Sequence, residues 1–433
     1  MTEETRETAH SYAYPEFGYF TVRVSASPDG GTTWTDWYTV PARVAVAPTQ
    51  MFVDSNSATP LFPYTTRATA ATTLGAAVGA LTNNVSENKT IIGGVDIVVL
   101  KGSKSNDTGI FLSTAVTIRG ETGNPADAEI VDNVPGFRAF TLSHPDAVVS
   151  NLTISGNGIK TNGAQGGHVR MTAGLVSNCV IKDGRAAGAA KGSGHGGNVW
   201  MSGGRLERCF VANGRANWGG FTGVDCFGMG LYASGGTIDS CFFKDNRDDN
   251  FDGRNYGSVC LAGTATMVNC TVTGGYSRYA NAAGIYINSA NATVVNCVAY
   301  GNYGNKDPIV STADSNFGNK NLGRYFHCAA AFTNASCATW TVLTDADFVK
   351  YESFTGNKFA QLNTYMTSEE YATFDWHQKR RSQLIGRGTI DAAYRPADSV
   401  TRDLDGNERV LHRTIDLGCW EKMLSVGFFY ILR

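Results

Sequence analysis

The chain has 433 residues, of which 50 are glycine and 17% are charged, and its formal net charge is −2 at pH 7. A balance this close to neutral argues against a general binder of nucleic acid or anionic membranes, because such proteins carry a basic excess. No apolar run reaches the roughly 18 residues that a membrane span requires, so no transmembrane segment is expected.

The first 50 residues predict a β-hairpin followed by a linker. Residues 19–27 alternate apolar and polar side chains, a turn follows at 28–32, and residues 34–40 alternate again. This alternation around a Gly-containing turn is typical of a hairpin. A lone hairpin is marginally stable in water, so we expect the remnant of an immunoglobulin-like or fibronectin-like module. Residues 41–50 are then the linker.

The chain begins with acidic and polar residues and shows no secretory leader. Together with the incomplete hairpin module, this start leads us to expect a piece of a longer secreted protein.

Residues 51–303 predict a solenoid with a cap at its N-terminal end. Met51–Asp54 begins a strand, residues 68–81 have the apolar spacing of one amphipathic helix, and Ile97–Leu100 is a buried strand. A strand and a short helix are expected there, because bare backbone groups at an open solenoid end would pair with another chain.

A cysteine recurs through the middle of the chain at intervals of 30, 32, 29 and 27 residues. A short β-branched or aromatic strand follows each cysteine, another precedes it, and glycine-containing turns lie between them. A fixed period of this length is typical of a solenoid, and short stacked strands describe an all-β, parallel β-helix. We therefore expect a column of small buried side chains at Cys179, Cys209, Cys241, Cys270 and Cys297.

These repeated cysteines are expected to serve packing and not disulfide bonding. Leu152 occupies the same phase one coil earlier, so an aliphatic side chain can take the same place. Parallel, in-register Cβ vectors are also poorly aimed for a disulfide. Cys328 and Cys337 are the expected disulfide pair, and their bond would indicate an oxidising compartment.

Asparagine stands immediately before the column residue in four coils. An Asn that recurs at one corner predicts a ladder of side-chain amides that hydrogen-bond along the stack, as in cross-β arrays. The four residues are Asn151, Asn178, Asn269 and Asn296.

Residues 304–433 are expected to hold the final irregular coils and a C-terminal cap. The period is lost after Tyr303, and short strands and turns follow between residues 382 and 421.

The chain resembles known β-helix families in two places. The coil repeats resemble right-handed β-helix proteins of the pectin-lyase-like class. Asp403–Asn407 and Ile415–Glu421 resemble the D-x-D-G-N turn and D-I-G-x-x-E line of the choice-of-anchor β-helix surface proteins of bacteria. The resemblance covers residues 52–421 and implies a right-handed β-helix on a secreted or surface-attached bacterial protein. The class includes lyases, hydrolases and adhesins.

The sixth residue after each column cysteine is Arg185, Arg215, Arg247, Tyr276 or Tyr303. Arginines one strand spacing apart repel one another unless anions lie between them. A carboxylated or sulfated glycan would be such an anion, because guanidinium pairs with it bidentately. The alternative is that each arginine pairs with a carboxylate in its own loop. Nearby aromatic residues that could stack on sugar faces are Trp218, Phe221, Tyr256 and Tyr279.

The acidic run at residues 245–253 contains the front half of a Ca²⁺ loop, D-x-N-x-D-G. Its candidate ligands are Asp248, Asn250 and Asp252. Val259 stands where an EF-hand needs glutamate, so an EF-hand is excluded. The remaining alternatives are a looser Ca²⁺ site and a solvated loop.

The same region holds the candidate catalytic residues. An eliminating lyase needs a base, usually Arg or Lys, beside a cation that neutralises the substrate carboxylate. Arg215 or Arg247 next to the acidic run meets that requirement. An inverting hydrolase needs paired carboxylates, for which Asp225 with Asp249 or Asp252 on adjacent coils could serve.

Two histidines are expected to have structural and not catalytic positions. Ser193–Gly196 resembles the Gly-His-Gly of polygalacturonase-type enzymes, but the accompanying Asn-Thr-Asp and paired-Asp motifs are missing. His195 is therefore expected to be a residue of a Gly-rich loop, and His168 an exposed strand residue.

The sequence thus predicts an extracellular or cell-surface, monomeric β-helix that binds polysaccharide through corner loops of stacked coils. The alternatives are a polysaccharide lyase or glycoside hydrolase, the former with Ca²⁺, and a structural stalk or adhesin. No nucleic-acid partner is expected.

Overall fold

The computed structural model describes most of the chain, and the regular elements of that part are almost all β-strands. The described residues are 16–81, 93–134, 136–159, 164–186, 194–216, 225–247, 254–277, 283–304, 313–314, 317–319, 324–330, 340–350, 374–411 and 413–423.

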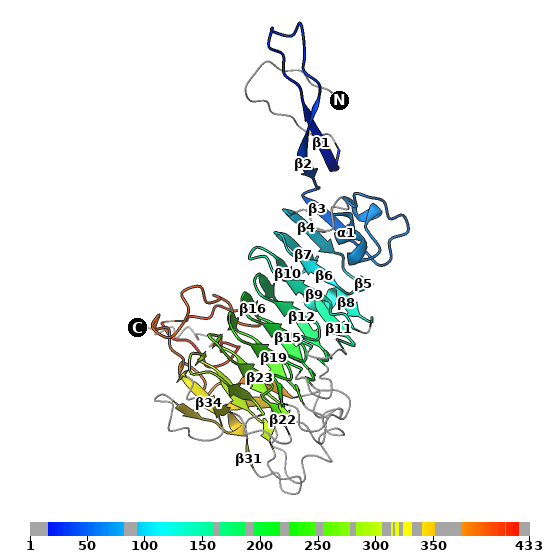
Figure 1. The fold of residues 1–433 in the computed structure, drawn as a ribbon. Coiled ribbons are helices and arrows are strands. Elements are labelled where there is room, and N and C mark those ends of the chain that lie inside the picture. The colour runs from blue at the N-terminus through cyan, green and yellow to red at the C-terminus, as the bar shows by residue number, and fades with distance from the viewer. Residues whose placement is uncertain are drawn as a thin grey trace, which may run out of the picture.

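Three long parallel sheets run along the molecule and enclose one core (Figure 1). In each coil the chain passes through sheet 1, then sheet 2, then sheet 3. Sheet 1 contains β6 (Ile110–Leu112), β9 (Phe140–Leu142), β12 (Val169–Met171), β15 (Val199–Met201), β19 (Leu231–Ala233), β23 (Val259–Leu261), β27 (Ile285–Ile287) and β32 (Phe317–Asn319).

Sheets 2 and 3 are longer by two strands each, and every neighbouring pair of strands is parallel. Sheet 2 contains β3 (Gln50–Val53), β4 (Val95–Val99), β7 (Val116–Gly120), β10 (Val148–Ser150), β13 (Leu175–Ser177), β16 (Arg205–Glu207), β20 (Thr237–Asp239), β24 (Thr266–Val268), β28 (Thr293–Val295) and β33 (Arg324–Phe326). Sheet 3 contains β5 (Lys104–Asn106), β8 (Glu129–Asp132), β11 (Thr153–Gly156), β14 (Val180–Lys182), β17 (Phe210–Ala212), β21 (Phe242–Lys244), β25 (Thr271–Thr273), β29 (Val298–Tyr300), β34 (Cys328–Ala330) and β35 (Trp340–Val342).

The three-residue strands alternate as the sequence pattern requires. In β12 the first and third residues, Val169 and Met171, are fully buried, while Arg170 between them points outward. Each position pairs with the same position one coil away, as in Val169 with Val199. Successive side chains of a strand point to opposite faces, so one face fills the core and the other meets the outside. The prediction of an all-β, parallel β-helix is confirmed.

The cysteine column lies at the turn between sheets 2 and 3. The backbone N–H of Cys209 donates to Sγ of Cys241 at 3.4 Å, and the same contact links Cys241 to Cys270 and Cys270 to Cys297. Each thiol also donates to the carbonyl two residues earlier, as Cys270 does to Val268 at 3.1 Å. Cysteine here acts as a small apolar residue whose weak S–H donor still serves the turn. The expectation of buried thiols and not disulfides is confirmed.

Cys328 continues this column by one more coil. It is fully buried as a thiol, and its Sγ donates to the carbonyl of Phe326 at 3.4 Å, as the other column residues do. The expected disulfide with Cys337 is therefore wrong for Cys328, while Cys337 itself lies outside the described residues. Cys328 follows Cys297 at about one repeat interval, so the same period that places the other thiols also places Cys328 in the column.

The residue before each cysteine adopts the left-handed conformation. Asn151, Asn178, Asn269 and Asn296 have φ between 48° and 56°, a region that Asn tolerates better than most residues. The amide of Asn178 donates to Asn151 at 2.7 Å and that of Asn296 to Asn269 at 3.0 Å. The predicted ladder therefore forms in two parts, and Arg208 interrupts it with φ at 47°.

The N-terminal end carries the expected strand and helix, but the helix is shorter than predicted. Helix α1 spans Leu74–Ala80, because Thr73 caps it by accepting a hydrogen bond from Ala76 N. The Asp107 carboxylate also accepts from the first backbone N–H groups of α1. Figure 1 shows α1 beside β3 at this end of the stack, and short 3-10 helices lie at Arg67–Thr69, Pro125–Asp127 and Asp345–Asp347.

The N-terminal hairpin pairs β1 (Gly18–Val24) with β2 (Tyr38–Val46) and extends away from the stack (Figure 1). The second strand thus begins later than expected, and most of the predicted linker is strand. Asp29 holds the intervening segment as a loop by accepting hydrogen bonds from Thr33, which lower the pKa of this carboxyl to about 2. Membership of a larger β-module stays a prediction.

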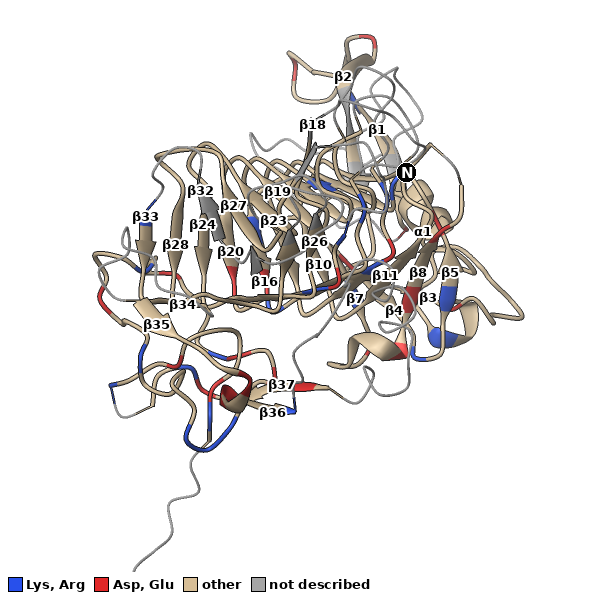
Figure 2. Cartoon of the chain, turned by 90° about the horizontal axis from the view of Figure 1, so that it is seen from below, with Lys and Arg blue, Asp and Glu red and all other residues tan. Residues whose placement is uncertain are grey.

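The C-terminal segment, residues 374–423, lies against the outer face of sheet 3. Phe242 contacts Trp420 with ring centroids 4.8 Å apart, within a buried cluster that also contains Tyr300 and Leu417. Two strands, β36 (Phe348–Lys350) and β37 (Asp375–Gln378), pair antiparallel at its start. Figure 2 shows many of the charged residues in this segment and near the N-terminal cap, while most of the stacked strands are largely uncharged.

The motif residues of this segment bind its own backbone. The Asp403 carboxylate accepts from Asn407 N at 2.7 Å and from Glu421 N at 2.8 Å. Asp416 accepts from Gly386 N at 2.7 Å, and Glu421 accepts in turn from Asp416 N at 3.0 Å. The residues that carry the family resemblance here therefore have a structural role, because they close two turns and tie them together.

Substitution of Asn296 should loosen the C-terminal segment. Its amide donates to Thr389 O at 2.9 Å and accepts from Thr389 N at 2.8 Å. Asn296→Ala loses the left-handed preference, about 1–2 kcal/mol, and leaves a buried N–H unsatisfied, about 1–3 kcal/mol. We expect a loss of roughly 3 kcal/mol in chemical unfolding and earlier proteolysis near Thr389. Asn178→Ala is the matched control, and equal proteolysis in both variants would contradict this assignment.

The C-terminal segment should loosen as the pH rises. Hydrogen bonds from His377 to Asp405 and Asp375 raise the pKa of this histidine, so its stabilisation is complete below its unfolded pKa of about 6.5 and is lost as the pH rises through the higher folded pKa. Burial raises the pKa of Glu421 to about 8, which gives the same sign between about 4.5 and 8. Hydrogen exchange at residues 403–407, corrected for intrinsic rates, should be faster at high pH. His377→Gln should flatten part of this change; an unaltered profile would show that His377 does not contribute.

Candidate functional site

The outer face of sheet 1 carries a row of side chains that runs along the stack. The first seven strands of this sheet point their middle residues away from the core, and register pairing places these residues one above another. In order along the stack they are Phe111, Thr141, Arg170, Trp200, Tyr232, Cys260 and Tyr286.

A second row lies just before sheet 1, where the chain arrives from sheet 3. Backbone bridges join Gln165 to His195 and His195 to Phe227. Two short strands, β18 (Asp225–Phe227) and β22 (Arg254–Tyr256), continue this row and pair Phe227 with Tyr256. The two rows are close enough for their rings to meet.

The rings of both rows form one connected array, which we call the aromatic track. The ring centroids of His195 and Tyr232 are 4.9 Å apart, those of Phe227 and Tyr256 are 5.0 Å apart, and those of Tyr256 and Tyr286 are 4.9 Å apart. Parallel in-register coils favour such contacts, because each ring has a neighbour about one strand spacing away. The track consists of His195, Trp200, Phe227, Tyr232, Tyr256 and Tyr286.

Neighbouring rings of the track cover much of one another's faces. Trp200 and Tyr232 are nearly parallel, with an interplanar angle of 14°. Trp200 Nε1 is buried and has no hydrogen-bond acceptor among the residues that the structure describes. A buried donor without an acceptor is uncommon in proteins and calls for an explanation, of which a bound ligand is one.

Positive charge gathers at the N-terminal end of the track. The guanidinium of Arg170 lies 4.9 Å from the centroid of the Trp200 ring, a cation–π contact, and its Nε donates to Gln165 Oε1 at 3.3 Å. Arg138 lies near enough to interact with it, because burial and the charge of Arg170 lower the pKa of Arg138 to about 10. Two guanidinium groups that interact in this way favour an anion between them.

A buried pair of ionisable groups, Asp132 and His168, lies beneath this end of the track. His168 is fully buried, with Nδ1 3.6 Å from the Asp132 carboxylate and Nε2 2.9 Å from the carbonyl of Lys182. Burial raises the pKa of Asp132. The expectation that His168 is exposed is therefore wrong. Its position one residue before β12 turns the ring toward the interior.

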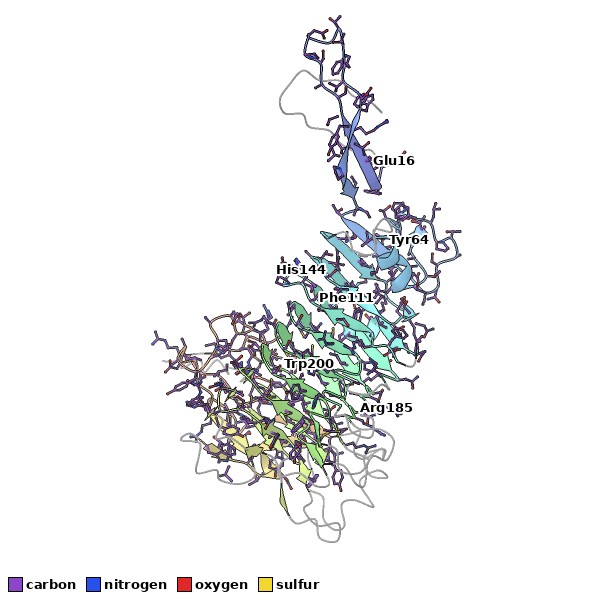
Figure 3. All side chains as sticks on the ribbon, in the orientation of Figure 1. Glu16, Tyr64, Phe111, His144, Arg185 and Trp200 are labelled. Atoms are coloured by element: carbon purple, nitrogen blue, oxygen red, sulfur yellow. The ribbon has the colours of Figure 1, made fainter. Side chains whose placement is uncertain are left out.

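The structure also aligns the backbone of the residues that were predicted to form an arginine column. Arg185 pairs with Arg215, and Arg247 pairs with Tyr276 in β26 (Tyr276–Ser277). Tyr276 in turn pairs with Tyr303 in β30 (Tyr303–Gly304), to which β31 (Ala313–Asp314) is added antiparallel. Figure 3 shows Arg185 at the edge of the stack and Trp200 over its middle strands. The binding role of this column stays a prediction.

Buried asparagine amides, which the sequence reasoning missed, hold the corner from which this column starts. Gly184 N donates to Asn198 Oδ1 at 2.8 Å, and Gly214 N donates to Asn246 Oδ1 at 2.9 Å. Asn302 accepts in the same way from Gly275 N at 2.9 Å. A signal was present, because Asn246 and Asn302 both stand five residues after a column cysteine.

Most of the predicted catalytic and metal-binding residues fall outside the part of the chain that the structure describes. Asp225 is placed by its backbone, opposite Arg254 on the next coil. The described residues contain no group of three or more His, Cys, Asp or Glu side chains arranged to hold a metal ion. The residues outside the described part are Trp218, Phe221, Asp248, Asp249, Asn250, Asp252 and Tyr279.

No helix in the described ranges has both the length and the apolar character needed to cross a membrane.

Comparisons with known proteins give likenesses among solved structures alone. No protein-family model and no curated protein matches the chain. Among solved structures, the chain is similar to the crystal structure of pectate lyase Pel9A, with 12% sequence identity and a TM-score of 0.47. The likeness covers 87% of this chain and 97% of that one.

The packing of the track makes Cys260 a reporter of its integrity. Cys260 is fully buried among Tyr232, Tyr256 and Tyr286, and burial raises the pKa of its thiol well above the usual range. We expect iodoacetamide to leave Cys260 unlabelled in the folded protein and to label it in Tyr286→Ala, as measured by peptide mass spectrometry. Cys241 in the core is the internal control. Rapid labelling of Cys260 in the wild type would contradict the packing of the track.

Proposed function

We propose that the protein binds a polysaccharide chain along the aromatic track of sheet 1. The observation that carries this proposal is the buried Trp200 Nε1–H, which has no acceptor among the described residues although it lies in a row of aromatic rings. Ligand sites combine apolar and aromatic walls with a few polar groups that fix orientation. A linear polymer with repeated hydroxyls suits a row of polar atoms that follows the repeat of the coils.

Recognition on this track differs from stacking of a sugar on an open ring face. Neighbouring rings of the track already contact one another at 4.9–5.0 Å. The groups left for a ligand are ring edges, the indole N–H of Trp200 and the phenol of Tyr232, whose pKa burial raises so that it stays a donor at neutral pH. Hydrogen bonds to sugar hydroxyls are therefore the main expected contacts.

The charges at the N-terminal end of the track favour an acidic glycan. Burial and the charge of Arg170 lower the pKa of Arg138, and a carboxylate or sulfate between the two guanidinium groups relieves this repulsion. The predicted column of Arg185, Arg215 and Arg247 would add further cations on the side facing sheet 3. Corner loops beyond these residues are part of the same proposed surface.

Two alternatives remain beside this proposal. A polysaccharide lyase, aided by Ca²⁺, or a glycoside hydrolase would use Arg215, Arg247, Asp225 and Asp249, and a stalk or adhesin would use the solenoid as a spacer. An extracellular or cell-surface location, a bacterial source and a monomeric state are proposals that rest on the family resemblance and the solenoid shape.

Binding is tested by calorimetry on a uronate-containing polysaccharide and a neutral one, with and without Ca²⁺. Trp200→Phe keeps the ring but removes the N–H, so loss of one hydrogen bond should weaken binding about 3- to 10-fold. Arg170→Gln should weaken binding of the acidic chain more than that of the neutral chain. Phe111→Ala is the matched control, because Phe111 belongs to the same outward row but lies two coils before Arg170 and is 48% exposed.

The outcomes separate the three functions. Equal affinities in wild type, Trp200→Phe and Arg170→Gln would show that the track is not the binding surface. A rise in ultraviolet absorbance from an unsaturated product, lost in Arg247→Ala, would establish the lyase. Absence of both binding and product across a panel of acidic and neutral glycans would favour the stalk.

A further inference from the structure

A cleft of about 350 Å³ lies at the corner opposite to sheet 1, between the coil stack and the C-terminal segment. One wall is the turn after β16, with Glu207 and Arg208, and the other wall is formed by residues 398–402. Figure 1 shows the C-terminal segment beside β16, and an ion pair between Arg205 and Asp398 joins the two walls. The volume lies at the lower end of the range found for small-molecule sites.

Arg208 departs from the pattern of its column. The equivalent turn residue is Asn in four other coils, Ser240 in the next coil and His327 in the last, and all of them have positive φ. The left-handed conformation is unfavourable for arginine, because arginine lacks the short polar side chain that makes this region accessible to Asn. A residue held in a conformation that it disfavours is a reason to look for a functional role.

The groups that line the cleft include more unsatisfied donors than acceptors. The backbone N–H of Arg208 donates to Asp239 O at 2.9 Å, but its guanidinium donates to no acceptor among the described residues, and the buried hydroxyl of Ser399 has no hydrogen-bond partner there either. Arg402 uses one of its five donors on Gly406 O at 2.7 Å. The carboxylates of Glu207 and Asp398 are both engaged by Arg205.

The net charge of the cleft also favours an anion. Arg205, Arg208 and Arg402 supply three positive charges, and Glu207 and Asp398 supply two negative ones, which leaves one positive charge. A guanidinium without a partner suits an oxyanion, to which it can donate two parallel hydrogen bonds. The two carboxylates keep lone pairs on the cleft side that can accept hydrogen bonds from hydroxyl groups.

We propose that this cleft binds a small oxyanion that also carries hydroxyl groups, the chemistry of a sugar acid. Arg208 and Arg402 hold the anionic group, Ser399 donates to it, and Glu207 and Asp398 accept from the hydroxyls. The cleft spans the stack and the C-terminal segment, so a bound ligand also holds the segment in place. This site is separate from the aromatic track, which lies on sheet 1.

The test is titration of the full chain with galacturonate, galactose and inorganic sulfate, followed by calorimetry. Galacturonate should bind at least tenfold more tightly than galactose, which lacks the carboxylate, and than sulfate, which lacks hydroxyls. Arg208→Asn should raise the dissociation constant for galacturonate at least tenfold. This variant places in the turn the residue that other coils use there, so its Tm should equal or exceed that of the wild type.

Two control variants isolate the cleft. Arg413→Asn makes the same substitution at another arginine with positive φ, 66°, outside the cleft, and it should bind galacturonate as the wild type does. Trp200→Phe alters the track, so a loss of galacturonate binding in this variant would assign that binding to the track, whereas a loss confined to Arg208→Asn assigns it to the cleft.

Three results would overturn the proposal. They are wild-type affinity in Arg208→Asn, absence of galacturonate binding up to roughly 10 mM, and binding of galactose or sulfate as tight as that of galacturonate.

Discussion

In-register parallel stacking of the coils is the constraint on which the rest of this structure depends. Adjacent strands lie about 4.8 Å apart, and each position pairs with its equivalent in the next coil, so every choice of residue becomes a column along the molecule. The side chains of one column must therefore pack against identical or similar side chains without repulsion. Thiols, amides and aromatic rings do so, because each can contact a copy of itself without repulsion.

The three corners of a coil satisfy this constraint with different kinds of residue. Between sheets 2 and 3, left-handed asparagines and buried thiols let the chain turn within two residues. Where the chain leaves sheet 3, the amides of Asn198, Asn246 and Asn302 bind backbone N–H groups from inside. On sheet 1 the aromatic track follows the outer face. Arg208 interrupts the asparagine column, and Arg170 brings a charge into the row on sheet 1. At these two places a bound ligand can supply contacts that the stacked coils do not provide.

The C-terminal segment adds a second layer over sheet 3 and also reaches sheet 2, where Asp398 pairs with Arg205. Its aromatic cluster covers the outer side chains of sheet 3, and Asn296 joins a turn of the ladder to Thr389, which is 93 residues later in the chain. Asp403, Asp416 and Glu421 then close the segment on itself. The outer face of sheet 1 instead carries the aromatic track, in which Trp200 and Tyr286 are themselves buried.

The sequence by itself determined the β-helix, the cysteine column and the position of the asparagine turns, because a fixed period translates directly into stacked strands. It placed Arg185, Arg215, Arg247 and Tyr276 in one phase, and backbone bridges join the first two and the last two of these residues. Only the tertiary structure decided which residues meet across different rows. The track joins residues such as His195 and Tyr232, which are 37 positions apart and follow no common period (232 − 195 = 37). Likewise, the side of the stack that the C-terminal segment covers depends on contacts between residues far apart in the chain, and no local pattern encodes them.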